Sequence, residues 1–231
     1  MNLTGKKIAV TGASGALGTA IVKAIRAAGG AVAAIDRHSA ADELRNLPGI
    51  ELLAGFDLSK PEDATNAIRE ASTRLGSLDG LVNVAGTFRW ETVEAGSADT
   101  WDLLYRVNLS TAVNASRAAV LVLANSGAGR IVNIGAAGEL KAAAGMGAYA
   151  ASKAGVIKLT EALAEETKAR NITVNAVLPS IIDTPANRAD MPKARFEHWV
   201  RTEQIADLVV FLLSDRASAI TGAAIPIVGR V

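Results

Sequence analysis

The stretch that decides the fold runs from residue 7 to residue 36 and reads KIAVTGASGALGTAIVKAIRAAGGAVAAID. Lys7 to Val10 is a short apolar run closed by a Thr-Gly pair, which predicts a strand followed by a turn. From Thr19 to Ala28 the apolar residues recur at helical spacing, and two glycines end that pattern. Ala31 to Ile35 is a second apolar run. The order strand, helix, strand predicts a βαβ unit with parallel strands.

The same alternation continues to the end of the chain. Further strands are predicted at Ile50–Ala54, Leu78–Val84, Arg130–Ile134, Ile172–Leu178 and Ala223–Val228. Further helices are predicted at Pro61–Leu75, Ala98–Ala124, Met146–Arg170 and Thr202–Leu213. The strands are apolar without alternation, as expected when both faces of a sheet are covered. We therefore predict an α/β fold, in which residues 1–231 form a single doubly wound Rossmann domain with a seven-stranded parallel sheet and helices on both faces.

Composition excludes several classes of protein. The formal net charge is +1 and no run of like charges exists, so no nucleic-acid partner is expected. The chain has no cysteine and only two histidines, which excludes disulfides and thiolate metal sites, and we expect no bound metal. Apolar stretches such as Ala118–Ala124 are too short to span a bilayer, and the first residues lack an apolar signal segment. We expect no membrane partner and a cytoplasmic location.

A glycine-rich turn joins the first strand to the first helix. Residues 11–18 read TGASGALG, with glycines at positions 12, 15 and 18. Such a turn lets backbone N–H groups approach a pyrophosphate, because no side chain obstructs them, and the helix N-terminus adds partial positive charge. A plain glycine-rich turn is the alternative. Its position between strand and helix favours a dinucleotide site that includes Gly12, Ser14, Gly15, Leu17 and Gly18.

Two residues after the second strand bear on the choice of cofactor. Asp36 ends that strand, where a carboxylate can hydrogen-bond the adenosine ribose. Arg37 follows directly and could attract a 2′-phosphate. Asp36 has the greater weight because it ends the strand and repels a phosphate. The prediction is NAD favoured over NADP.

Tyr149 and Lys153 stand four residues apart on a predicted helix, so they project from the same face. A free phenol titrates near ~10, and lowering that value by about three units requires ~4 kcal/mol. A neighbouring ammonium and an oxidised nicotinamide ring could supply this. The phenol would then give a proton to an alkoxide or remove one from an alcohol. An exposed pair without function is the alternative.

These features together resemble the short-chain dehydrogenase/reductase family over the full length of the chain. Asp57-Leu58 resembles the acidic pair that contacts adenine. The segment with Asn83, Ala85 and Gly86 resembles the family's Asn-Asn-Ala-Gly motif, with Val84 for the second Asn. Asn108 is similar to the helix asparagine that holds a water in the proton relay.

The turn Pro179–Thr184 resembles the family's nicotinamide-binding turn, with Ser180 where glycine is usual. The resemblance implies that Thr184 and the backbone of Ile182 meet the carboxamide, and that Lys153 also holds the nicotinamide ribose. It implies an oxidoreductase that moves hydride between NAD(P) and a small carbonyl or alcohol. Catalytic roles then fall to Asn108, Tyr149 and Lys153.

The chain departs from the family pattern at the substrate site. The family's serine should lie about thirteen residues before the tyrosine, and that position holds Ala136. Dihydropteridine reductases have alanine there as well, so a pterin is a minority possibility for the substrate. Residues 185–201 correspond to the substrate lid and are short, which suggests an open pocket.

Two further expectations follow. The missing serine favours an alternative in which the chain is a nucleotide-binding sensor or pseudo-enzyme with little turnover, whereas the tyrosine, lysine and asparagine argue for an enzyme. A nucleotide-sugar epimerase is disfavoured, because no C-terminal substrate domain follows. The apolar segments Ala98–Ala124 and Met146–Arg170 predict a homodimer or homotetramer through a four-helix interface.

Overall fold

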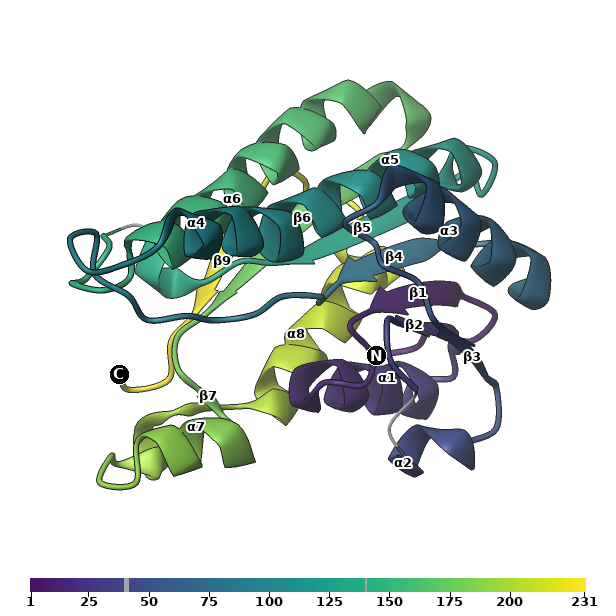
Figure 1. Ribbon diagram of the computed structural model, residues 1–231. Coiled ribbons are helices and arrows are strands. Elements are labelled where there is room, and N and C mark those ends of the chain that lie inside the picture. The colour runs from purple at the N-terminus through teal and green to yellow at the C-terminus, as the bar shows by residue number, and fades with distance from the viewer. Residues whose placement is uncertain (40–41, 140) are drawn as a thin grey trace.

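Seven strands form one parallel sheet in the order β3-β2-β1-β4-β5-β6-β9 (Figure 1). The computed structural model describes residues 1–39, 42–139 and 141–231. The strands are β1 (Lys7–Thr11), β2 (Ala31–Asp36), β3 (Ile50–Ala54), β4 (Gly80–Asn83), β5 (Gly129–Ile134), β6 (Ile172–Pro179) and β9 (Ala224–Ile227). The predicted seven-stranded parallel sheet is confirmed. Every residue of β5 and β6 is buried, which explains why these strands show no alternation of apolar and polar residues.

Helices cover both faces of the sheet. On one face α1 (Ala16–Ala27) packs beside α8 (Thr202–Leu213), and their apolar residues share one core cluster with β1 and β2. On the other face α3 (Pro61–Leu75) and α5 (Thr111–Leu123) form the second cluster, together with the C-terminal part of α6 (Gly147–Thr167). Figure 1 shows this three-layer arrangement, with α1 and α8 below the sheet and α5 and α6 above it.

The strand order reverses between β1 and β4. Strands β2 and β3 follow β1 on one side, whereas β4, β5, β6 and β9 continue on the other. In doubly wound sheets, ligands bind at the carboxyl ends of the strands beside such a reversal. The residues that follow β1, β4 and β5 are therefore brought to one edge of the sheet.

Two predicted helices were wrong in detail. Residues 98–124 do not form a single α-helix. The chain forms α4 (Ala98–Leu104), a π-helical segment η1 (Tyr105–Ser110) and then α5. The predicted helix that starts at Thr19 also begins earlier, at Ala16, so its first turn includes part of the glycine-rich sequence.

Several short elements were missed. They are α2 (Asp42–Arg45), α7 (Pro185–Asp190) and the parallel pair β7 (Ile182–Asp183) and β8 (Val200–Arg201). Single-turn segments also occur at η2 (Ala137–Glu139), η3 (Lys168–Arg170), η4 (Phe196–His198) and η5 (Asp215–Ala217). The segment from α7 to β8 occupies residues 185–201, where the sequence predicts a lid. These elements have too few residues to produce a recognisable period.

Candidate active site

The glycine-rich turn is shaped by the chain's own backbone at two of its three glycines. A Cβ atom on Gly12, whose φ is +61°, would lie 2.7 Å from Ala85 Cα. A Cβ on Gly18 would lie 2.1 Å from the Gly12 carbonyl oxygen. Gly15 differs, because a Cβ there would meet only that same oxygen, at an ordinary 3.5 Å. Packing thus requires Gly12 and Gly18, while the turn stays open at Gly15, directly before α1. This cradle fits a pyrophosphate at the N-terminus of α1.

The Asp36 carboxylate lies against this turn. Its Oδ2 accepts a hydrogen bond from the Ser14 N–H at 3.0 Å, and its Oδ1 accepts one from the His38 N–H at 3.2 Å. The carboxylate therefore stands between the end of β2 and the glycine-rich turn. Arg37 is exposed, and its positive charge lies near enough to contribute to the lowered pKa of Asp57.

Asp57 and Leu58 follow β3, and both are held by neighbouring polar groups. The pKa of Asp57 is lowered mainly because the Ser59 hydroxyl donates a hydrogen bond of 2.7 Å to the carboxylate. Asn114 on α5 donates to the Leu58 carbonyl oxygen at 3.0 Å. The turn that the family resemblance assigns to adenine is thus fixed on both sides.

The segment after β4 passes directly over the glycine-rich turn. The Thr11 hydroxyl oxygen accepts hydrogen bonds from the N–H groups of Val84 (3.1 Å) and Ala85 (3.3 Å). Asn83 is turned inwards and is 4% exposed, and its amide donates to Asn133 Oδ1 at 2.8 Å. The structure therefore places the Asn83 side chain beneath the crevice, where it joins β4 to β5.

Tyr149 and Lys153 both lie on the first turns of α6, as the spacing predicts. Lys153 is 5% exposed, and its Nζ donates a hydrogen bond of 2.7 Å to the carbonyl oxygen of Ile134 at the end of β5. A Cβ on Gly86 would lie 3.3 Å from that Nζ, so the ammonium faces the segment after β4. The ring of Tyr149 meets the edge of the Phe88 ring, with 5.0 Å between centroids.

Asn108 lies in the π-helical segment and is 1% exposed. Its Oδ1 accepts a hydrogen bond from the Thr87 N–H at 2.7 Å, and its Nδ2 donates to the Ser152 hydroxyl oxygen at 2.9 Å. Asn108 thus joins the segment after β4 to the helix that carries the tyrosine and the lysine. The π turn brings it there, because π-bulges reorient residues within an otherwise regular helix.

Ala136 follows β5 and is buried, with 7% of its surface exposed. Gly135 donates its N–H to the Val177 carbonyl oxygen at 2.9 Å, so the backbone is still held by the sheet just before this position. Beyond it the loop is held by Trp90, whose Nε1 donates to the Ala144 carbonyl oxygen at 3.1 Å. The alanine at the position of the family's serine is therefore buried, in a stretch of backbone anchored on both sides.

The turn after β6 carries the residues expected to meet the nicotinamide. Pro179 ends the strand, and the Ser180 hydroxyl donates to the Val228 carbonyl oxygen at 2.8 Å. Thr184 caps α7, since its hydroxyl oxygen accepts the Asn187 N–H at 3.2 Å. The amide of Asn187 donates to the Ile182 carbonyl oxygen at 2.7 Å. These bonds fix the course of the turn, and Ser180 uses its side chain to tie it to the C-terminal tail.

A family model for the short chain dehydrogenases matches residues 6–195. The chain belongs to this family. An acetoacetyl-CoA reductase of Shinella zoogloeoides is 35% identical, with 94% of each chain covered. The 2-(S)-hydroxypropyl-CoM dehydrogenase 3 of Xanthobacter autotrophicus is 34% identical, covering 98% of this chain and 96% of the relative. The solved short-chain dehydrogenase/reductase of Serratia marcescens is 32% identical, with a TM-score of 0.88 over 99% of this chain and 98% of that one.

As a short-chain dehydrogenase, the protein is an oxidoreductase of a family that uses NAD(P). The structure brings the glycine-rich turn, Asp36, Gly86, Lys153 and Asn108 into one connected region through the bonds described above. Sequence reasoning included Thr11 in the glycine-rich turn without its contact to the segment after β4, and it missed Ser152 and Phe88 as parts of this region. Each of these residues stands within or near a motif quoted above, so its neighbourhood was known from the sequence. The direction of its side chain was not, because sequence position does not determine it.

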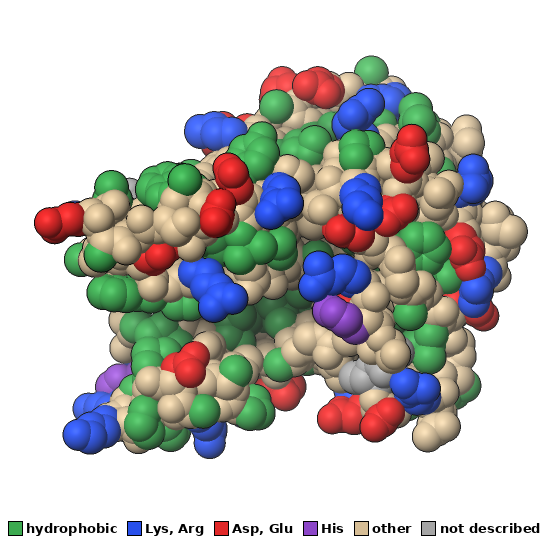
Figure 2. Space-filling view, in the orientation of Figure 1, with side chains coloured by type: hydrophobic (Ala, Val, Ile, Leu, Met, Phe, Trp, Pro, Cys, Tyr) green, Lys and Arg blue, Asp and Glu red, His purple; other side chains and the backbone are tan. Residues whose placement is uncertain are grey.

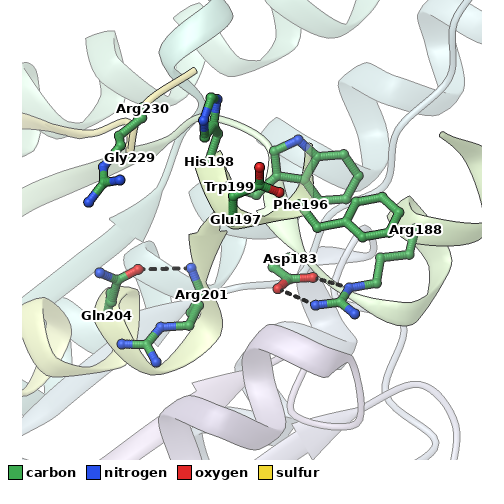
Figure 3. Close-up of a pocket in the computed structure, with 10 residues that line it drawn as sticks. All are labelled: Asp183, Arg188, Phe196, Glu197, His198, Trp199, Arg201, Gln204, Gly229 and Arg230. Carbon is green, nitrogen blue, oxygen red and sulfur yellow. Dashed lines mark hydrogen bonds and ion pairs between the residues drawn. The ribbon is translucent and has the colours of Figure 1, made fainter. Parts of the chain in front are cut away.

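A pocket of about 320 Å³ lies beside this region, between the 185–201 segment and the C-terminal tail (Figure 3). Asp183 and Arg188 point toward one another there and form two hydrogen bonds, of 2.6 and 2.8 Å. This contact is the main cause that lowers the pKa of Asp183. Asn108, Tyr149 and Lys153 do not line the pocket. The pocket is thus separate from these three residues, which lie at the strand ends.

Figure 2 shows a hollow between the lobe that carries α7 and the body of the molecule, lined by hydrophobic side chains.

Within residues 1–39, 42–139 and 141–231, no cluster of three potential metal ligands occurs. Over the same described ranges, no helix combines the length and the apolar character needed to cross a membrane.

Proposed function

We propose that this short-chain dehydrogenase moves hydride between NAD and a small carbonyl or alcohol substrate, with Tyr149 as the general acid and base. The observation that carries the proposal is the placement of Lys153. It is buried, it donates to the Ile134 carbonyl at the end of β5, and it faces Gly86 after β4. A buried ammonium at the sheet edge, one helical turn from a phenol, suits proton transfer better than a surface pair does.

In the proposed mechanism the phenol of Tyr149 gives its proton to the substrate oxygen during reduction and removes it during oxidation. The positive charge of Lys153 favours the phenolate form, because opposite charges stabilise one another in a site shielded from water. Asn108 keeps the helix and the segment after β4 in register. When bound, the nicotinamide cofactor supplies or accepts the hydride. Gly12, Gly15, Gly18 and the first turn of α1 would hold its pyrophosphate.

We propose a preference for NAD over NADP, set by Asp36. Its carboxylate lies beside the glycine-rich turn, where it accepts the Ser14 N–H. A 2′-phosphate placed on the adjacent ribose would meet that negative charge. Arg37 is exposed to solvent, which screens its attraction for a phosphate.

The substrate proposal rests on the Phe88 ring beside Tyr149 and on the activities named for two relatives. The Phe88 ring contacts the ring of Tyr149, and Ala136 is buried just after β5. Two relatives are named 2-(S)-hydroxypropyl-CoM dehydrogenase 3 and acetoacetyl-CoA reductase. A small ketone or secondary alcohol fits these features. A quinonoid pterin is the less favoured substrate, suggested only by the alanine at position 136.

A second candidate is a nucleotide sensor with little turnover. Ala136 favours it, because a donor to the substrate oxygen is missing from the position where the family has one. Absorbance at the nicotinamide band, recorded with a panel of ketones and alcohols and with each cofactor, separates the two. Turnover that disappears in Tyr149→Phe supports the enzyme, whereas tight cofactor binding without turnover of any substrate supports the sensor.

We also propose that the chain forms a homodimer or homotetramer through α4, α5 and α6. Large apolar side chains are exposed along α4 to α5, including Trp101 at 42%, Tyr105 at 57% and Leu121 at 73%. Exposed apolar surface of this kind marks contacts with other chains. Light scattering at micromolar concentration tests the proposal, and a monomer would contradict it.

A further inference from the structure

A buried chain of hydrogen bonds links the backbone of Tyr149 to the segment after β4. The chain includes neither the Tyr149 phenol nor the Lys153 ammonium. The Thr87 N–H donates to Asn108 Oδ1 at 2.7 Å, and Asn108 Nδ2 donates to the Ser152 hydroxyl oxygen at 2.9 Å. The Ser152 hydroxyl in turn donates to the Tyr149 carbonyl oxygen at 2.7 Å. Asn108 and Ser152 are only 1% and 3% exposed. Water therefore has little access to replace any of these bonds.

Within this set of hydrogen bonds, Ser152 is the residue that both accepts and donates through one side-chain oxygen. A hydroxyl has one proton and two lone pairs. Because the proton goes to the Tyr149 carbonyl, a lone pair is left to accept the Asn108 amide, and both contacts fix the same side-chain orientation. A longer polar side chain could not serve both contacts, and an alanine would serve neither.

The helix and the π turn are also packed closely at the next turn of α6. A Cβ on Gly155 would lie 2.5 Å from Leu109 Cδ2, so the two segments are closer than a residue with a Cβ atom at position 155 would allow. Steric contact sets the distance between them, but apolar contact does not fix how far α6 is rotated or shifted along its axis. The hydrogen bonds through Ser152 provide that directional constraint.

We propose that Ser152 is a positioning residue for the hydride-transfer reaction. By accepting the Asn108 amide and donating to the Tyr149 carbonyl, it fixes the first turn of α6 relative to the π turn and to the segment after β4. The Tyr149 phenol and the Lys153 ammonium project from that same turn, so their placement depends on it. This inference rests on the proposed function of Tyr149 and adds a residue that acts through it without touching the substrate.

The same helix provides a matched control. Thr160 lies two turns further along α6 and is fully buried. Its hydroxyl donates to the Val156 carbonyl oxygen at 2.8 Å and accepts the amide of Asn133 at 2.8 Å. It thus repeats the contacts of Ser152, with a buried asparagine as donor, but at a distance from the tyrosine. Thr160→Val removes this hydroxyl while keeping the volume of the side chain.

The test compares Ser152→Ala with Thr160→Val in the full chain. Each variant leaves one buried asparagine amide without its acceptor, so both should lower Tm by roughly 3–10 °C. Only Ser152→Ala should reduce kcat, by about 10- to 100-fold, because small displacements of a proton donor are costly. The dissociation constant for NADH, measured by fluorescence, should stay near wild type in Thr160→Val and should rise by less than kcat falls in Ser152→Ala, because the pyrophosphate cradle at α1 is untouched while Lys153 projects from the affected helix turns.

Equal kcat in Ser152→Ala and wild type would overturn the proposal, and so would an equal loss of kcat in both variants. If Ser152→Ala does not fold, Ser152→Cys gives a graded version, because a thiol is a weaker donor and acceptor. An intermediate loss of kcat then supports the proposal, and an unchanged kcat overturns it. Tyr149→Phe is assayed in parallel. Full activity in that variant would refute the proposed acid–base role itself, which separates its failure from that of the positioning role.

Discussion

Restoring a hydroxyl at position 136 should increase turnover of simple ketones. In the structure Ala136 is 7% exposed and follows β5 by two residues. The backbone before it is fixed by the Gly135 N–H bond to Val177, and η2 begins directly after it. Ala136→Ser adds one oxygen atom to a side chain that is held on both sides. The anchored backbone therefore restricts the positions that the added hydroxyl can reach.

The size of the gain lies between two limits. An ordinary neutral hydrogen bond contributes about 1 kcal/mol, roughly fivefold in rate. A preorganised donor to a developing oxyanion contributes about 10²–10³ in kcat. The position is anchored and shielded from water, but the donor is a single hydroxyl with rotational freedom. We expect a gain of about 10- to 100-fold, equivalent to roughly 1.4–2.7 kcal/mol in activation free energy.

The assay measures kcat for reduction of small ketones by NADH, with the NADH dissociation constant determined separately. Ala137→Ser is the control, because it adds the same hydroxyl one residue later, at the start of η2 and outside the position of the family's serine. A quinonoid dihydropterin is tested as a second substrate and should show no gain, since its reduction needs no such donor. A change of less than threefold in Ala136→Ser on every ketone, with cofactor binding intact, would refute this reasoning.

Three other predictions concern the cofactor, the acid–base pair and a titrating carboxyl. Asp36→Ala should raise the ratio of kcat/KM for NADP to that for NAD by at least tenfold, because a like charge is removed from the ribose site, and a wild-type preference for NADPH would show that the reasoning is wrong. Tyr149→Phe should lower kcat by about 10²–10⁴ while NADH binding stays nearly unchanged. Lys153→Ala should lower kcat and also weaken NADH binding. Calorimetric titration with NADH distinguishes this variant from Tyr149→Phe. The Asp57 pKa is lowered, mainly by the Ser59 hydroxyl, so this carboxyl stabilises the fold above its unfolded pKa and the contribution is lost as the pH falls through the lowered value. Ser59→Ala should raise that pKa toward its usual range in a carbon-13 NMR titration, and an unchanged pKa would contradict the assignment.

The sequence predicted the sheet well because the strands are short apolar runs separated by glycine and proline. Both ends of α3 and of α8 were predicted to the residue. The π segment could not be predicted, because residues 98–124 contain no glycine or proline and so give no signal that the helix changes within them. The segment packs closely against α6 at Leu109 and Gly155, and such contacts between residues far apart in the sequence leave no local pattern.

The candidate site was predicted as a set of residues but not as a set of orientations. The spacing of Tyr149 and Lys153 determines that they share a helix face, and this holds in the structure. The inward direction of Asn83 depends on Asn133 and Ser116, which belong to other elements. The role of Ser152 depends in the same way on Asn108. Such pairings arise from packing between elements, and no local pattern specifies them.

The C-terminal tail has a consequence for motion. Its Val228 carbonyl accepts the Ser180 hydroxyl, and the Arg230 N–H donates to the His198 carbonyl oxygen at 2.9 Å. The tail thus ties the turn after β6 to the returning half of the 185–201 segment. Movement of that half away from the crevice must break one of these bonds or carry the tail with it. If this segment opens during turnover, as lid loops do in other enzymes, its opening is coupled to the order of the last four residues.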